Sequence, residues 1–124
     1  MKIITPENIE WIEAKPENIK IGLFPIEWDE KISIIHARIK PGEIMTEHYH
    51  ERPQQGHEIY FFYKGGKFRI TSNGQTKDFD TQEPFYWTIK NGEKHKIENL
   101  GDNILEFQAI YTPKFEMDEV KYLK

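Results

Sequence analysis

Turn signals recur at short intervals through most of this chain, and they limit the elements between them to a few residues each. The turns separate runs that are rich in β-branched and aromatic residues, which are typical of strands. About eight to ten short strands result, which predicts an all-β fold, an antiparallel sandwich or barrel. The turn positions are Pro41-Gly42, Gly65-Gly66, Asn73-Gly74, Asn91-Gly92, Gly101-Asp102-Asn103 and Pro113.

Helix is expected only in short segments near the termini. Thr5 suits the N-cap of such a segment, and Pro6 suits its first helical position. The length of 124 residues fits one domain. We expect an N-terminal extension with strands in residues 1–30, a barrel in 31–113 and a tail in 114–124.

The strand expected at 32–39 has one polar and one apolar face. His36 and Arg38 share one face, because side chains two apart in a strand point the same way. The other face carries Ile35, Ala37 and Ile39. If the polar face lined the barrel interior, Arg38 would hold an anionic substrate group; otherwise both polar residues are structural.

The strand expected at 58–64 is apolar on both faces, which is typical of a central strand. Tyr60, Phe62 and Lys64 share the side of Glu58. Tyr60 is therefore a candidate for the lining of a pocket, and Trp87, in the aromatic run 85–87, is another.

His48, His50 and Glu58 form the first candidate site. The two histidines lie two apart, so both imidazoles point to the same side of a strand. If this strand and the run that opens at Glu58 pair as a hairpin, the carboxylate returns beside the imidazoles. Two nitrogen ligands and one oxygen ligand suit a divalent transition metal. The chain has no cysteine, so thiolate ligands are excluded.

These residues resemble the first motif of the cupin superfamily. Gly42 is followed by five residues and His48-Tyr49-His50, and Glu58 is followed by six residues and Gly65. The second cupin motif is matched by Gly92, His95 and Asn99. The resemblance covers residues 32–112.

The chain departs from the cupin motifs at three places. Seven residues separate His50 from Glu58, where the family usually has three or four, and Glu51 becomes an alternative carboxylate ligand. We favour Glu58 because Gly65 follows it at the family's spacing. Lys90 and Pro84 stand where the second motif usually has a proline and a glycine.

The resemblance implies a jelly-roll β-barrel with one divalent metal inside it. The ligands would be His48, His50, Glu58 and His95, with two positions left for water or substrate. Mn, Fe, Ni, Co and Zn all occur in the family, and this ligand set does not choose among them. Small cupins commonly pair through exchanged N-terminal strands, so the resemblance also implies a homodimer.

Residues 95–111 further resemble the metal-dependent cupin phosphoglucose isomerases, through His95-x-x-x-Asn99-x-Gly101-Asp102 and Phe107-x-Ala109-Ile110-Tyr111. This implies an isomerase or epimerase reaction on a carbohydrate or sugar phosphate, with the metal polarising a carbonyl. Glu58 would be a ligand or, when detached, the base, and Tyr60 would assist it. Arg38, Tyr60, Lys64 and Trp87 would bind substrate. The alternatives are a metal-dependent dioxygenase and a non-enzymatic module that binds a small ligand.

The charge and hydropathy of the chain argue against nucleic acid and membranes as partners. The net charge is −4 and no basic run occurs, which argues against nucleic acid. No stretch approaches the length needed to span a membrane. The first residues contain no apolar run of signal-peptide length, so a cytoplasmic protein is expected.

Overall fold

The computed structural model describes residues 3, 5–14, 19–23, 32–51, 57–83, 85–112 and 120–122. These residues form strands and a single 3₁₀ turn, which confirms the predicted all-β fold. None of them belongs to a helix long and apolar enough to cross a membrane. Pro84, Pro113 and residues 114–119 and 123–124 of the predicted tail lie outside the described residues. The elements are η1 (Pro6–Asn8), β1 (Glu10–Ala14), β2 (Ile19–Leu23), β3 (Ser33–Ile39), β4 (Ile44–His50), β5 (His57–Lys64), β6 (Lys67–Ser72), β7 (Gln75–Asp80), β8 (Phe85–Lys90), β9 (His95–Asn99), β10 (Leu105–Thr112) and β11 (Val120–Tyr122).

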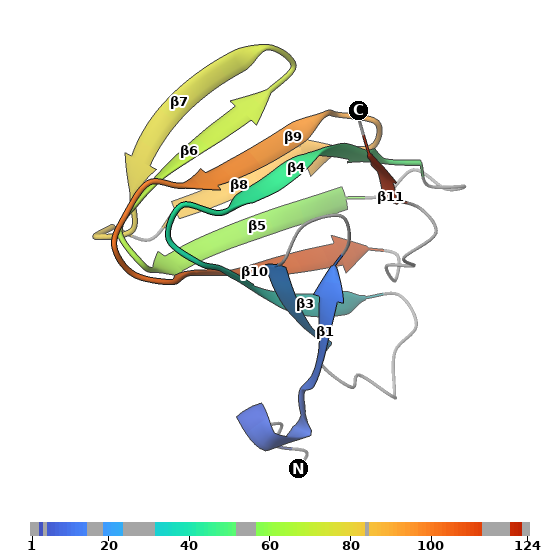
Figure 1. The fold of residues 1–124 in the computed structure, drawn as a ribbon. Helices are drawn as coiled ribbons and strands as arrows, with labels where there is room; N and C mark the ends of the chain where they lie inside the picture. Colours follow the sequence, from blue (N-terminus) through green and yellow to red (C-terminus); the bar gives the residue numbers. More distant parts are fainter. Residues whose placement is uncertain are drawn as a thin grey trace.

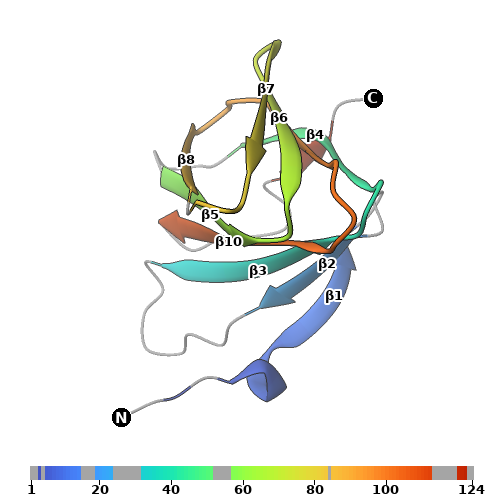
Figure 2. The ribbon, with the colours of Figure 1, turned by 90° about the vertical axis from the view of Figure 1, so that its left-hand side faces the viewer.

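The strands form two antiparallel sheets that face each other (Figure 1). The six-stranded sheet has the order β1-β2-β3-β10-β5-β8, and the five-stranded sheet has the order β11-β4-β9-β6-β7. Figure 2 looks along the barrel that the two sheets enclose. In that view β1 and β2 lie outside the barrel, beyond β3. This arrangement places the inward side chains of both sheets around one interior.

Aromatic rings from both sheets fill part of this interior. Phe62 on β5 stacks on Phe68 of the opposite sheet, with ring centroids 4.4 Å apart, and on Phe107 of β10 at 4.7 Å. All three side chains are fully buried. Full burial of one such ring contributes roughly 1.5–3 kcal/mol, so a few large rings supply a core that aliphatic residues alone would not fill.

Strands β4 and β5 do not form the hairpin that we considered from the sequence. Instead β4 pairs with β9 and β11, while β5 pairs with β10 and β8 in the other sheet. A tight hairpin needs a short turn, whereas residues 51–56 separate these two strands. The two strands therefore face each other across the barrel, which buries the inward side chains of both.

Side chains on β3 follow the predicted alternation. Ile35, Ala37 and Ile39 are buried, and His36 and Arg38 lie on the opposite, outer face of the six-stranded sheet. Trp11 of β1 pairs with Gly22, which in turn pairs with His36. Because glycine has no side chain, the indole reaches across β2, and its ring lies 5.7 Å from the His36 ring.

Lys64 does not lie on the side of β5 that the sequence predicts. We expected Lys64 on the same side as Tyr60, but its ammonium lies 3.4 Å from the Glu106 carboxylate, and Glu106 in turn contacts Arg38 and His36 of the outer face. The pairing of β5 with β10 shifts register between Glu106 and Phe107. Such a bulge reverses the alternation of side chains beyond it, so Lys64 turns outward.

Asn99, from the second sequence motif, ties one end of the barrel together. Its side-chain amide donates to the carbonyl oxygens of Ile39, at 2.9 Å, and Asn103, at 2.8 Å. Its side-chain oxygen accepts from the Gly101 amide at 2.9 Å. These bonds join the ends of β3 and β9 to the turn that leads into β10, so the motif's asparagine has a structural role.

Candidate metal centre

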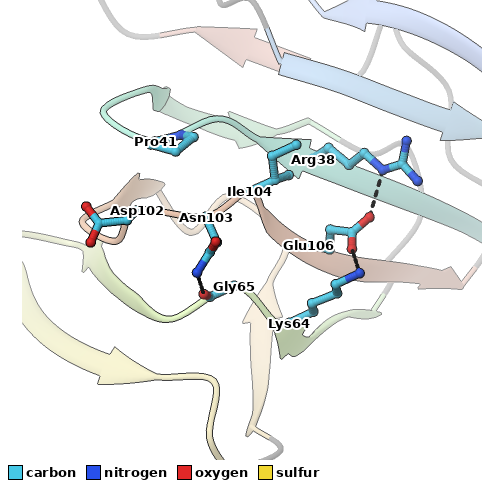
Figure 3. A pocket seen from close by; sticks show the side chains of 8 residues that line it. All are labelled: Arg38, Pro41, Lys64, Gly65, Asp102, Asn103, Ile104 and Glu106. Carbon is cyan, nitrogen blue, oxygen red and sulfur yellow. Dashed lines mark hydrogen bonds and ion pairs between the residues drawn. The ribbon is translucent and has the colours of Figure 1, made fainter.

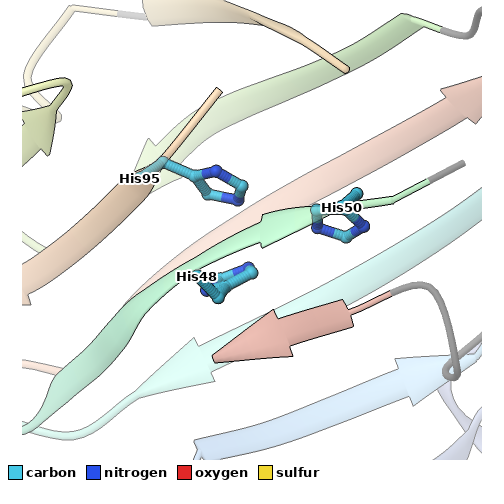
Figure 4. A group of neighbouring side chains, drawn as sticks. All are labelled: His48, His50 and His95. Carbon is cyan, nitrogen blue, oxygen red and sulfur yellow. The ribbon is translucent and has the colours of Figure 1, made fainter. Parts of the chain in front are cut away.

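Three buried histidines converge inside the barrel. His48 and His50 come from β4, and His95 comes from the neighbouring strand β9, directly opposite His48 (Figure 4). One ligand atom from each ring lies within 4.8 Å of the other two. Three atoms that close share a centre no more than about 2.8 Å from each, near the bond lengths of roughly 2.0–2.1 Å that a metal needs.

A bulge in β4 points both histidines of this strand inward. The pairing of β4 with β9 shifts register between Met45 and His48. Met45 is buried, and the next two residues are half-buried. His48 and His50 are buried again. Regular alternation from Met45 would have buried Glu47 and Tyr49 instead, so the bulge places the imidazoles in the barrel.

Backbone carbonyls determine which nitrogen of two of the rings carries the proton. Nδ1 of His48 lies 2.8 Å from the Thr46 carbonyl oxygen, and Nδ1 of His95 lies 2.9 Å from that of Glu93. A carbonyl only accepts, so each Nδ1 donates its N–H and each Nε2 keeps a lone pair. This tautomer presents Nε2 as a metal ligand, and the carbonyl contact orients the ring as is usual in metal sites.

Burial keeps two of these histidines neutral. It lowers the pKa of His48 from its ordinary value of 6.5. The pKa of His95 lies well below that value, first because of burial and then because His48 and His50 lie close by. Neutral imidazole is the form that binds a metal. The donor set therefore fits a divalent transition metal, although it does not specify which one.

Glu58 lies beside the histidines, as the sequence motif suggested. Its Oε2 is 3.2 Å from Nε2 of His50, and the residue is buried. Glu51, the alternative carboxylate, is exposed at the end of β4. In the part of the chain that the structure describes, the close group of potential ligands contains the three histidines and not Glu58. Glu58 thus flanks this group next to His50.

Aromatic side chains line the space next to the histidines. The Tyr60 hydroxyl lies 3.0 Å from Nε2 of His95 and 3.4 Å from the Tyr111 hydroxyl. Trp87 meets both the Tyr60 and His95 rings edge to face, at 5.7 and 5.9 Å. Sequence reasoning had not selected Tyr111 for the site. Its parity with Phe107 and Ala109 in the last long apolar run would have indicated an inward position.

Arg38 and Lys64 lie together elsewhere, on the outer face. They flank Glu106, with Arg38 Nε 2.7 Å from its Oε1 and Lys64 Nζ 3.4 Å from its Oε2 (Figure 3). Burial alone would raise the pKa of the Glu106 carboxyl, but these two cations outweigh it and hold the pKa below its ordinary value. The three residues border a cavity of about 610 Å³, and Asn103 lines the same cavity. Neither cation is beside the histidines.

A second cavity borders Glu58. Its volume is about 560 Å³, and Lys90 contributes to its wall. A small molecule in this space would therefore lie next to Glu58. The remaining lining residues are His57, Ile59, Thr88, Ile89 and Asn91.

Comparison with known sequences gives one partial match and no family model. The chain is 31% identical over 67 residues to the tetracenomycin polyketide synthase protein TcmJ of Streptomyces glaucescens. The match spans 54% of this chain but only 41% of the length of TcmJ.

Solved structures match far more of the chain. Streptomyces PAC13 with uridine, described as a nucleoside dehydratase, has a TM-score of 0.74 at 12% identity, covering 100% of this chain and 91% of PAC13. KdgF from Halomonas sp. has a TM-score of 0.72 at 14% identity, over 92% of this chain and 96% of KdgF. The cupin domain of Schizosaccharomyces pombe Cnp3 has a TM-score of 0.66 at 11% identity, over 89% and 72%. The protein is therefore a cupin in fold, as its two sequence motifs predict.

Proposed function

We propose that this protein binds one divalent transition metal through His48, His50 and His95, and that it catalyses an isomerase or epimerase reaction on a small carbohydrate-like molecule. One observation carries the proposal: three buried imidazoles converge, and two of them have their Nδ1 atoms bound to carbonyls. The Nε2 atoms of these two rings carry the lone pairs that would bind one cation.

The proposed reaction needs a base beside the metal. A bound metal would supply Lewis-acid polarisation of a substrate carbonyl. Glu58 would take the proton from the adjacent carbon, because its carboxylate flanks His50 and the residue lines the 560 Å³ cavity. The same carboxylate would return the proton to the neighbouring atom, which completes an isomerisation.

Tyr60 and Trp87 would enclose the reacting molecule. Tyr60 is almost fully buried, and Trp87 is partly buried against it. An indole face packs well on the apolar side of a sugar ring, while the surrounding rings exclude water from the site. Arg38 and Lys64, which we had expected to bind substrate, would act only on a ligand that reaches the outer face.

The likeness to a nucleoside dehydratase supports a sugar-containing substrate and favours a second candidate reaction. PAC13 is similar in fold along the whole of this chain and is observed with uridine, which contains a ribose. Dehydration of a sugar begins with the same proton abstraction next to a carbonyl and ends with loss of a hydroxyl group. Glu58 would again be the base.

Metal analysis and a substrate panel test the proposal. Protein purified without chelators should contain about one transition-metal ion per chain by elemental analysis. The metal-loaded protein should convert at least one member of a panel of sugar phosphates and oxidised nucleosides, followed by NMR in D₂O. Deuterium incorporation without water loss supports the isomerase, whereas loss of water supports the dehydratase. A loaded protein that exchanges no proton in any of these compounds would contradict both reactions.

A homodimer is also part of the proposal. Strand β1 forms the edge of the six-stranded sheet and pairs only with β2 in the described chain. An unpaired edge of this kind can accept a strand from a second copy. Sedimentation equilibrium should give twice the chain mass of 14.9 kDa, and a mass of one chain would overturn this part.

A further inference from the structure

The Tyr60 hydroxyl contacts a nitrogen that we propose binds the metal. The hydroxyl oxygen lies 3.0 Å from Nε2 of His95. The other nitrogen of that ring donates to the Glu93 carbonyl, so Nε2 is the nitrogen with a lone pair. An ion on Nε2 would therefore have the Tyr60 oxygen beside it.

The separation of 3.0 Å is that of a hydrogen bond from the hydroxyl to Nε2, and it also lies in the range for two ligands of one ion. Bonds of about 2.0–2.2 Å place neighbouring ligand atoms roughly 2.8–3.5 Å apart in tetrahedral or octahedral geometry. The Tyr60 oxygen meets this distance from Nε2 in the present arrangement of the side chains.

The surroundings hold the Tyr60 ring in this position. The residue is only 2% exposed and lies on β5, in the interior of its sheet. Its ring is 5.2 Å from that of Phe107 and 5.7 Å from that of Trp87. The hydroxyl cannot leave the front of His95 unless these rings repack, which is costly in a dense core.

We infer that Tyr60 supplies an oxygen ligand to the metal held by His48, His50 and His95. This inference rests on the metal-binding role proposed above. Glu58, whose Oε2 lies 3.2 Å from Nε2 of His50 but outside the close histidine group of the described chain, then remains available as the base. Tyr60 replaces the carboxylate ligand that the cupin motif implies.

Two other tyrosines near the histidines provide matched controls. The Tyr111 hydroxyl lies 3.4 Å from that of Tyr60, and the Tyr111 ring is 5.5 Å from the His50 ring. The Tyr122 ring is 5.6 Å from the His48 ring. A Tyr→Phe change at any of the three positions removes one hydroxyl and keeps the ring.

Iron spectroscopy distinguishes the three tyrosines. The wild type and the variants Tyr60→Phe, Tyr111→Phe and Tyr122→Phe are loaded with Fe(II) without oxygen and then oxidised to Fe(III). A phenolate on Fe(III) gives a visible charge-transfer band, and resonance Raman excitation in that band enhances tyrosine ring vibrations. We expect the band in the wild type, Tyr111→Phe and Tyr122→Phe, and its loss in Tyr60→Phe. Metal affinity of Tyr60→Phe should fall about 10-fold or more.

Each other outcome overturns either the role of Tyr60 or metal binding itself. Iron-loaded wild type without the band overturns the role of Tyr60 and leaves metal binding intact. A band that survives in Tyr60→Phe but disappears in Tyr111→Phe also overturns it, and assigns the oxygen to Tyr111. A wild type that takes up no metal overturns the metal-binding proposal itself. Circular dichroism of each variant verifies that the barrel is folded.

Discussion

At the scale of single residues, the site histidines divide their two ring nitrogens between their own strand and the barrel interior. His48 and His95 each bind, through Nδ1, the carbonyl of the residue two positions earlier in the chain. The tautomer of each ring is therefore set by the local backbone. The Nε2 atoms of both rings point into the barrel, where the three histidines from two strands form one group.

Removal of one imidazole should abolish metal binding. We expect His48→Ala and His95→Ala to lower metal affinity by more than the roughly 10–100-fold that follows loss of an outer-shell partner, because a ligand itself is lost. Isothermal titration with Zn²⁺ or Co²⁺ measures the change. His36→Ala serves as the control, because His36 lies on the outer face and should leave the affinity unchanged. Equal losses in all three variants would contradict the assignment.

At the scale of elements, two β-bulges decide which side chains enter the barrel. The bulge in β4 turns His48 and His50 inward, and the bulge between β5 and β10 turns Lys64 outward. The turns at the ends of the strands are equally specific. Gly65, between β5 and β6, has a φ of +139°, and a Cβ there would lie 2.8 Å from the Cα of Leu105.

Gly65→Ala should destabilise the barrel more than Gly66→Ala does. Both glycines have a φ that other residues rarely adopt, but a Cβ at Gly66 would have no atom within 4 Å, whereas at Gly65 it would strike backbone. The difference isolates the steric clash, and we expect it to exceed about 1 kcal/mol in the free energy of unfolding. Urea denaturation followed by circular dichroism measures both variants. Equal stabilities would mean that the turn relaxes freely.

At the scale of the whole molecule, the metal-free barrel should lose stability as the pH falls. Burial lowers the pKa of His36, His48 and His95 in the folded protein. Below their ordinary value of 6.5 the unfolded chain takes up protons that the folded chain does not, so acidification favours unfolding. The free energy of unfolding is thus fully retained above that pH and declines below it.

Urea titrations of chelator-treated protein at pH 7.5 and 5.5 test this dependence. Each fully buried histidine reduces the free energy of unfolding by at most about 1.4 kcal/mol per pH unit below 6.5. His48→Ala should flatten the dependence relative to the wild type. A stability that rises between pH 7.5 and 5.5 would show that these histidines are charged in the folded state.

The sequence alone determined the fold class, most strand positions and the three histidines. Turn residues and two-residue alternation are local properties of the chain, so they can be recognised without knowing which strands are neighbours. The predicted faces of β3 follow from the same alternation, and the motif spacing correctly linked His95 to His48 and His50 over a long sequence separation.

Only the tertiary structure decided which strands pair and which side chains of each strand face the barrel interior. Whether β4 meets β5 in a hairpin or across the barrel depends on which arrangement buries more apolar surface, and no local pattern records that choice. A bulge shifts the alternation by one residue because of pairing with another strand, which is why Lys64 lies on the outer face. Strand identity is thus a local property of this chain, while the position of each side chain relative to the site depends on contacts between distant strands.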